Sequence, residues 1–223
     1  MKIRYHISDR FGGVSQEPYN WLNLAYHSGD NPKKVAQNRQ ILFKKLGISQ
    51  AQFANQIHST RVLLIDDFIT PPPECDGFIT TKANLPLAIM SADCFGVLLF
   101  DSTNHIIAAL HAGRAGATQG IVKKALKMMH SLGAKEIEAI LSPGIHQCCY
   151  EISAEMASQY PKRFIKNGRF LDIKQIIYED LQRGGVESIK DYNICTCCDE
   201  RYYSYRREGV TGRFVSIIWM EER

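Results

Sequence analysis

The chain has 223 residues, of which 45% are hydrophobic and 22% are charged, and its formal net charge is +4. This is an ordinary globular composition, and the length fits one large domain or two small ones. Lysines and arginines are scattered in pairs, which argues against a nucleic-acid-binding protein. The longest apolar tract, 85–100, is interrupted by Asp93 and is shorter than the roughly 20 residues that span a membrane. We therefore expect neither nucleic acid nor a membrane as a partner.

The cysteine content indicates a reducing compartment. The chain has seven cysteines, which is an odd number, and its first residues contain no apolar signal segment. We therefore expect a cytoplasmic protein whose thiols are reduced.

In chain order, the first predicted helix has Asn31 as its N-cap and Pro32 at its first position, and it ends at Gly47. The turn-forming residues 101–104 lie between two apolar runs, which we expect to pair as a hairpin. The runs with strand character in this half of the chain are 62–65, 78–80, 87–90, 97–100 and 106–110.

Two further helices and two further strands are predicted in the second half of the chain. One helix covers 118–130 and carries a periodic apolar stripe. The other begins at Asp172 and ends before Gly184. The strands cover 137–141 and 214–219.

The order of these elements determines the expected fold class. Helices and strands do not alternate strictly, which favours an α+β domain with a mixed sheet over a doubly wound parallel sheet. Several strands are apolar on both faces, so their sheets should be covered by helices or by one another.

Soft metal ligands lie on either side of the expected hairpin. Cys94 follows a buried apolar run, and His111 directly follows the run 106–110. His58 has a similar strand-then-turn setting. One thiolate and two imidazoles suit Zn²⁺, with a fourth position left for water or substrate. If these three side chains converge, they form a catalytic metal site.

Each of these residues also has a simpler interpretation. Cys94 could be a buried thiol that acts as a small hydrophobe, or a nucleophile with His111 as its base, as in a cysteine hydrolase. His111 could be a hydrogen-bonded turn residue, and His58 is one of seven histidines with little specificity alone.

The cysteines in the second half of the chain give a weaker signal. Cys148 and Cys149 are adjacent. The run from Cys195 to Cys198 has C-x-C spacing, and not the C-x-x-C spacing of a zinc knuckle. We therefore expect that Cys195, Cys197 and Cys198 do not form a second zinc site.

Ordered motifs extend over nearly the whole chain. They are Phe11–Ser15, Leu22–Leu24, His27–Asp30, Asn38-Arg39, Gln56–Ser59, Ala92–Cys94, His111–Gly113, Pro143, Ile145, Cys148–Glu151, Ser204–Arg207 and Thr211–Arg213. In this order they resemble the laccase-domain family, whose members are also described as multicopper polyphenol oxidases, purine nucleoside phosphorylases and peptidoglycan editing factors.

The resemblance implies a single domain over 1–223 with a four-layer α/β/β/α sandwich and mixed β-sheets. It implies that His58, Cys94 and His111 bind zinc, with copper as the alternative metal. Cys94, His111 and Asp93 would then be the catalytic residues. The implied reaction is phosphorolysis of adenosine, inosine and methylthioadenosine, with adenosine deamination as a side activity.

Phosphorolysis needs a cationic group that binds phosphate, and the candidates are Arg114, Arg206 and Arg207. Gln56, in the first ligand motif, is a further candidate for substrate binding. The third motif departs from the family pattern His-Ala-Gly-Trp-Arg-Gly, because 111–116 reads His-Ala-Gly-Arg-Ala-Gly. Since the arginine has moved by one position, we expect the guanidinium of Arg114 to point elsewhere and to bind phosphate poorly.

Two alternatives of other classes remain open. A ligand set of two histidines and one cysteine also occurs in blue copper sites, which would suit a copper-dependent polyphenol oxidase. Multicopper laccases, however, contain several His-x-His pairs, and this chain has none. The other alternative is an editing factor in the synthesis of peptidoglycan precursors, a role that could coexist with the enzyme.

Overall fold

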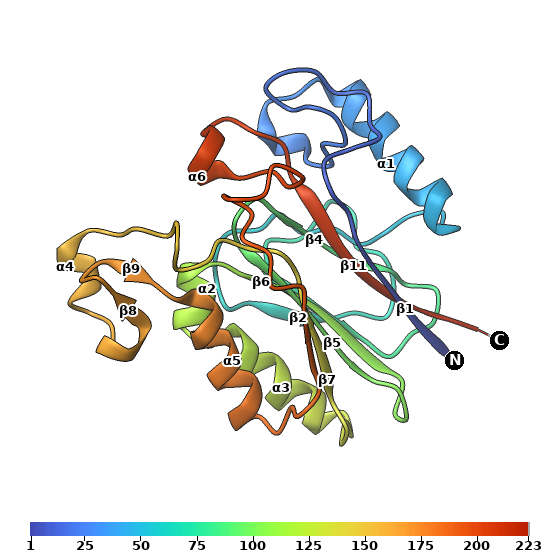
Figure 1. Ribbon diagram of the computed structural model, residues 1–223. Helices are drawn as coiled ribbons and strands as arrows, with labels where there is room; N and C mark the ends of the chain where they lie inside the picture. The colour runs from blue at the N-terminus through green and yellow to red at the C-terminus, as the bar shows by residue number, and fades with distance from the viewer. Residues whose placement is uncertain (223) are drawn as a thin grey trace.

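Two β-sheets form the centre of the computed structural model, which describes residues 1–222 (Figure 1). The small sheet has the strand order β1-β11-β4 and is antiparallel. The large sheet has the order β10-β7-β5-β6-β3-β2 and is mixed, because β10 pairs with β7, and β2 with β3, in parallel. The strands are β1 (Lys2–Ile7), β2 (Val62–Leu64), β3 (Gly77–Thr80), β4 (Leu87–Ser91), β5 (Phe95–Asp101), β6 (Ile106–Ala112), β7 (Glu138–Leu141), β8 (Ile165–Lys166), β9 (Phe170–Leu171), β10 (Ile189–Asp191) and β11 (Phe214–Glu221).

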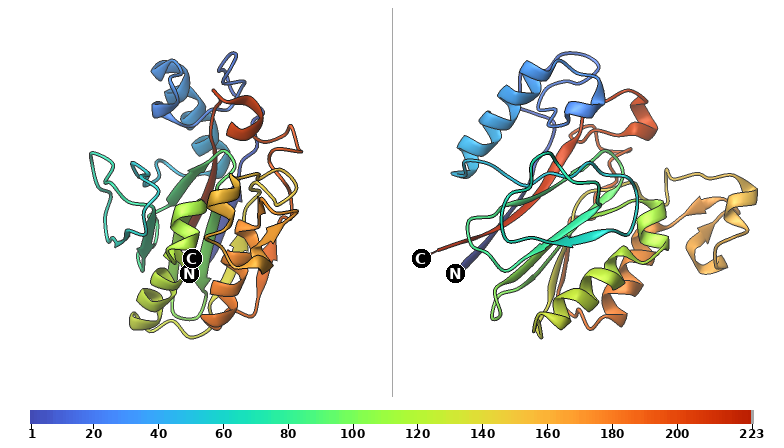
Figure 2. Two further views of the ribbon diagram at one scale, coloured as in Figure 1. Left: turned by 90° about the vertical axis from the view of Figure 1, so that its left-hand side faces the viewer. Right: turned by 180° about the vertical axis from the view of Figure 1, so that it is seen from behind.

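Helices cover the outer faces of the two sheets (Figure 2). Leu42 of α1 shares a buried cluster with Trp219 on the small sheet. The two sheets face each other across a second cluster that contains Ile89 of β4 and Leu98 of β5. Helices α3 and α5 lie on the outer face of the large sheet, in a cluster with Val97. The helices are α1 (Pro32–Leu46), α2 (Arg114–Thr118), α3 (Ile121–Ser131), α4 (Ala154–Ala157), α5 (Ile173–Arg183) and α6 (Tyr205–Glu208), with 3-10 turns η1 (Tyr26–Ser28) and η2 (Lys162–Phe164). The α+β class and the order of layers implied by the resemblance are confirmed.

The signals at the ends of α1 and α5 are confirmed. The Asn31 side chain accepts a hydrogen bond of 2.9 Å from the Lys33 N–H, and Gly47 ends α1 in the left-handed conformation with φ 70°. Asp172 caps α5 by accepting a hydrogen bond of 2.9 Å from the Gln175 N–H. Each of these helices begins where a side chain satisfies a free backbone donor.

The helix predicted over 118–130 corresponds to α3, which begins at Ile121, and Thr118 is the last residue of the separate short helix α2. Gly120 has φ +83° and separates α2 from α3, so the predicted start at Thr118 is wrong. A left-handed residue interrupts the hydrogen-bonded ladder, and glycine adopts this conformation without steric cost. The apolar stripe of α3 is buried as expected.

The predicted hairpin of β5 and β6 is confirmed, and it carries the site. Its register pairs Phe95 with Ala112 and Asp101 with Ile106. Both strands extend beyond the predicted runs toward Cys94 and His111, which therefore lie at the same end of the hairpin. The strands that the sequence did not predict include β1 and β10, which are at the edges of their sheets and lack a continuous apolar run.

Candidate metal centre

Three side chains converge at the open end of the β5–β6 hairpin. Cys94 lies in the bend where the chain crosses from β4 to β5, and His111 is near the end of β6. His58 lies in a turn before β2, with φ 58°, and does not follow a strand as expected. Their ligand atoms all lie within 4.8 Å of one another, and the two imidazole rings are 4.8 Å apart between centroids. The three residues that the sequence pointed to thus form one group that could hold a metal ion.

Gly113 provides the space for this group. A Cβ atom at this position would lie 2.7 Å from the Cys94 Sγ and 3.4 Å from the His58 Cδ2. The first distance is shorter than real Cβ contacts, so any larger residue would displace the thiol. Gly113, the glycine of the His-Ala-Gly motif, is therefore required by packing around the sulfur.

Asp76 connects the two histidines, and no motif in the sequence had pointed to it. Its Oδ1 atom lies 2.8 Å from the His111 Nδ1 and accepts a hydrogen bond of 3.0 Å from the His58 N–H. Its Oδ2 atom accepts a hydrogen bond of 2.6 Å from the Ser59 N–H. A carboxylate behind a ligating histidine fixes the ring and leaves the other nitrogen for the metal. Burial disfavours the ionised carboxyl, but these hydrogen bonds outweigh it and lower the pKa of Asp76.

Electrostatics in the group favour a thiolate. Burial opposes ionisation of Cys94, but the positive field of His111 and His58 outweighs it and lowers the pKa of the thiol to about 6. Burial likewise opposes charge on His111, but Cys94 and Asp76 raise its pKa to about 9. The thiolate is the form of cysteine that binds metals, so the group is prepared for a soft cation.

A cavity of about 770 Å³ lies in front of the three ligands. This volume is in the range that holds a nucleoside-sized molecule. Its wall combines aromatic side chains, cations and the candidate ligands. The described residues that line it are His27, Gln56, His58, Met90, Ser91, Ala92, Asp93, Cys94, His111, Arg114, Ala115, Ile145, Tyr150, Tyr205, Arg206 and Arg213.

Of the three arginines that the sequence suggested for phosphate binding, two line the cavity. Arg114 is among the residues that line the cavity, and its Nη1 atom lies 3.4 Å from the hydroxyl of Tyr160, which is not among the described lining residues. The expectation that Arg114 binds phosphate poorly stays a prediction. Arg206 also lines the cavity. Arg207 is not among the described lining residues, and its guanidinium donates to backbone carbonyls at 2.6 and 2.7 Å. Arg213, which belongs to the last of the family-like motifs but was not predicted to bind phosphate, is the third lining arginine, and its Nη1 atom donates to the Thr211 and Gly212 carbonyls at 2.8 and 2.9 Å.

Gln56 and Asp93 line the cavity but have structural partners. The Gln56 amide pairs with the backbone of Met90, donating and accepting hydrogen bonds of 2.8 Å. The Asp93 carboxylate accepts from the Thr196 hydroxyl at 2.8 Å and from the Arg206 N–H at 2.7 Å. Asp93 also has φ 97°, a conformation that is costly for a residue with a side chain. Both residues therefore position the loops around the candidate metal ligands, and the catalytic role expected for Asp93 stays a prediction.

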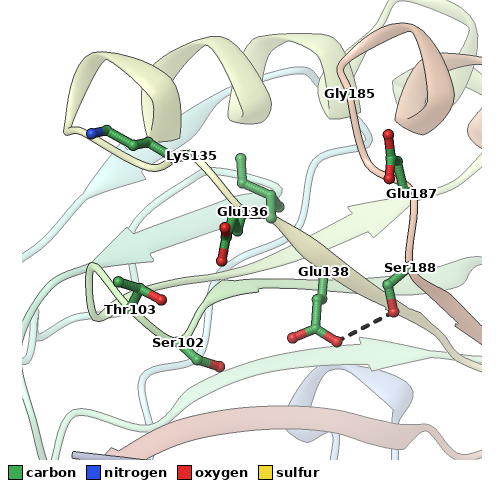
Figure 3. Close-up of a pocket in the computed structure, with 9 residues that line it drawn as sticks. Ser102, Thr103, Lys135, Glu136, Glu138, Gly185, Glu187 and Ser188 are labelled. Carbon is green, nitrogen blue, oxygen red and sulfur yellow. Dashed lines mark hydrogen bonds between the residues drawn. The ribbon is translucent and has the colours of Figure 1, made fainter.

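A second cavity lies at the opposite end of the hairpin, beside its turn (Figure 3). Its volume is about 410 Å³, and its lining includes Ser102, Thr103 and three glutamates. One of these, Glu138, accepts a hydrogen bond of 3.2 Å from Ser188. The lining contains neither histidine nor cysteine among the described residues. The candidate catalytic residues therefore lie at the opposite end of the hairpin from this second cavity.

A second group of cysteines was not expected. The Sγ atoms of Cys148, Cys149, Cys195 and Cys198 all lie within 4.8 Å of one another, while Cys197 is outside the group. The C-x-C spacing of Cys195 and Cys197 had predicted no second zinc site. Cys195 and Cys198 are in fact separated by two residues, which is the C-x-x-C spacing.

Among the residues that the structure describes, no helix has the length and apolar character that a bilayer crossing requires.

Several proteins of known sequence resemble this chain over almost their full length. A purine nucleoside phosphorylase of Mycobacterium tuberculosis is 39% identical, with 99% of this chain and 93% of the relative covered. One from Corynebacterium glutamicum is 38% identical over 98% of this chain and 94% of the relative. One from Haemophilus influenzae is 32% identical over 98% and 95%.

Solved structures show the same fold. A Neisseria meningitidis protein is 31% identical, with a TM-score of 0.89 and coverage of 99% of this chain and 95% of that chain. A Geobacillus stearothermophilus protein has a TM-score of 0.90 at 25% identity, with 99% and 92% covered. The family model described as multi-copper polyphenol oxidoreductase laccase matches residues 4–221. This chain therefore belongs to the multi-copper polyphenol oxidoreductase laccase family.

Proposed function

We propose that this chain is a purine nucleoside phosphorylase whose active site is the cavity in front of His58, Cys94 and His111. The observation that carries the proposal is the presence of a soft-ligand group and three arginines on one nucleoside-sized cavity. The relatives named purine nucleoside phosphorylase support it, because they match this chain at 32–39% identity over most of its length.

Zinc is the metal that we propose for the site. The donors are one sulfur and two imidazoles, Asp76 supports His111, and Gly113 keeps the sulfur accessible, so the residues present fit the ion. When bound, zinc would supply a Lewis acid beside the substrate. The substrates are then a small purine nucleoside and phosphate, with no nucleic acid or membrane partner.

Phosphorolysis requires a site that binds phosphate and a site that binds the purine base. A phosphate oxygen forms a bond to the anomeric carbon while the glycosidic C–N bond breaks, and the base leaves with the electron pair and gains a proton. Arg114, Arg206 and Arg213 face this cavity and can hold the phosphate by charge-assisted hydrogen bonds. Their positive field also stabilises the anionic nucleophile next to the sugar.

The tyrosines of the cavity suit the base. Tyr150 and Tyr205 present aromatic faces on which a purine can stack. Burial raises the pKa of the Tyr150 phenol, so its O–H remains a hydrogen-bond donor at neutral pH. The Arg206 guanidinium lies over the Tyr150 ring at 5.1 Å and holds it in place. Tyr150 therefore orients the purine relative to the phosphate-binding arginines.

A product assay tests the proposal. The zinc-loaded protein is incubated with adenosine, with and without phosphate, and ribose 1-phosphate and adenine are measured. We expect both products only when phosphate is present, and inosine in addition if the site also deaminates. Absence of ribose 1-phosphate from adenosine, inosine and methylthioadenosine alike would contradict the proposal.

Copper-dependent oxidation of phenols is the second candidate, because the family description and the two-histidine, one-cysteine donor set both allow it. Among the described residues, only one group of potential ligands contains histidine, which is fewer than a multicopper centre needs. Oxidation of a phenol by the copper-loaded protein, without nucleoside turnover, would favour this candidate. We also propose a cytoplasmic location, since all seven cysteines are free thiols.

A further inference from the structure

Four cysteine side chains form a compact group outside the proposed active site. The Cys149 and Cys198 Sγ atoms are 3.3 Å apart, and those of Cys148 and Cys198 are 3.7 Å apart. All four sulfurs, including that of Cys195, lie within 4.8 Å of one another. Four sulfurs bound to one zinc at 2.3 Å in a tetrahedron would be about 3.8 Å apart. The group is therefore close to the geometry of a four-sulfur metal site.

Two turns present these cysteines in pairs. In the first turn the Cys149 N–H donates to the His146 carbonyl at 3.0 Å, and in the second the Cys198 N–H donates to the Cys195 carbonyl at 3.1 Å. A parallel bridge between Gly144 and Cys195 holds the two turns side by side. The sulfurs are therefore brought together by the backbone.

A backbone N–H also donates a hydrogen bond to one of the four sulfurs. The His146 N–H points at the Cys195 Sγ, with a distance of 3.4 Å. Cys195 is buried, whereas Cys148 and Cys198 are exposed, so the group has an inner wall and an open side. This arrangement lets an ion enter from solvent and leaves it bound to sulfur alone.

We propose that Cys148, Cys149, Cys195 and Cys198 bind a second zinc ion in a closed, structural site. Four thiolates in a tetrahedron are a closed ligand set with no position for substrate. A disulfide is the competing interpretation, but it would join only two of the sulfurs and leave the other two beside it. Its S–S bond is about 2.05 Å, whereas the Cys149 and Cys198 Sγ atoms are 3.3 Å apart and those of Cys148 and Cys198 are 3.7 Å apart.

The site would fix the wall of the nucleoside cavity. Tyr150, which lines the cavity, directly follows Cys149. Thr196, inside the second turn, donates to Asp93 at 2.8 Å and accepts from Arg207 at 2.6 Å. A zinc ion that ties the two turns together therefore holds both Tyr150 and the bend that carries Cys94.

Zinc content provides the test, and it does not depend on phosphorolysis. The wild-type protein, purified with reductant and dialysed, should retain two zinc ions per chain. Cys94→Ser should retain one, and X-ray absorption of that variant should show four sulfur neighbours at about 2.3 Å. Cys198→Ser should lose one zinc, whereas the matched variant Cys197→Ser, outside the group, should keep both.

Three results would overturn the proposal. These are no retained zinc in Cys94→Ser, a zinc in that variant bound mainly by nitrogen or oxygen, or two fewer titratable thiols than the seven in the denatured, reductant-purified protein. If Cys198→Ser does not fold, the absorption spectrum of Cys94→Ser decides alone. Loss of phosphorolysis with both zinc ions retained would count against the proposed function only.

Discussion

The two cysteine-containing centres of this protein differ in donors, in support and in surroundings. The first has one sulfur and two imidazoles, supported by the buried Asp76, and faces a cavity of about 770 Å³. The second has four sulfurs on two turns. An incomplete ligand set beside a cavity suits catalysis, whereas a complete set suits structure. The same ligand type is therefore suited to reaction or to stability according to what completes its coordination.

The backbone conformation also differs between the two centres. At the first centre, His58 and Asp93 have positive φ angles of 58° and 97°. Such conformations persist where surrounding interactions enforce them, here the hydrogen bonds to Asp76 and from Thr196. The cysteines of the second group are not among the described residues with positive φ. Asn84, His105, Asn167 and Asn193 also have positive φ, between 49° and 58°, so among the described non-glycine residues Asp93 alone departs clearly from the ordinary left-handed range.

The largest expected effect comes from Cys94→Ser. A neutral hydroxyl replaces the thiolate, so the first centre should lose its metal and kcat/KM for adenosine should fall by about 100-fold or more, which is ~2.7 kcal/mol. Steady-state kinetics with metal analysis measure this. Cys197→Ser, outside both groups, is the matched control and should retain activity. Equal activity in the two variants would contradict the assignment of Cys94 to the active site.

Asp76→Asn tests the support of the first centre. The amide keeps the shape but removes the charge behind His111, so zinc affinity should fall by about 10- to 100-fold. Competition with a chromogenic chelator gives the affinity. Asp67→Asn, an exposed position, is the control. An unchanged affinity would show that His111 needs no orienting carboxylate.

Alkylation of the metal-free protein compares the two centres by pH. The pKa of Cys94 is lowered to about 6, so its thiolate fraction and its reaction with iodoacetamide should rise roughly tenfold from pH 5 to pH 7 and then level off. Burial, together with the neighbouring sulfurs, raises the pKa of Cys148 to about 11, so its reaction should still be increasing at pH 9. Peptide mapping separates the two sites. Faster modification of the exposed Cys148 than of Cys94 at pH 7 would contradict this assignment.

The smallest effect is expected for Arg114→Ala. Because Arg114 is one of three arginines that line the cavity, its loss should raise the phosphate KM by about fivefold, or ~1 kcal/mol, with little change in adenosine KM. Arg169→Ala, at an exposed ion pair with Glu151, is the control. An unchanged phosphate KM would assign the binding to Arg206 and Arg213.

Local signals made much of the fold predictable. The caps of α1 and α5 and the turn of the hairpin depend on neighbouring residues, and the structure has them where the sequence placed them. The short break at Gly120 was missed, because a glycine inside an apolar periodicity does not reveal its φ angle. The polar edge strands β1 and β10 had no apolar run to detect.

The sequence predicted the three candidate ligands of the first centre, but it did not predict the residues that hold them in position. Asp76 acts on His111, 35 residues away, and Cys148 meets Cys198 across 50 residues. Such partners depend on sheet topology, which spacing along the chain does not contain. For the same reason the sequence could not show that Arg213 lines the cavity while Arg207 is not among its described lining residues, although both guanidinium groups donate to backbone carbonyls.

The most direct test of the contrast between the centres is an anomalous difference map recorded at the zinc edge from crystals grown with inosine and phosphate. We predict one peak among His58, Cys94 and His111, with nucleoside density in the adjoining cavity, and one peak among the four cysteines with no ligand near it. Absence of a peak at His58, Cys94 and His111, or nucleoside bound away from that cavity, would contradict the account.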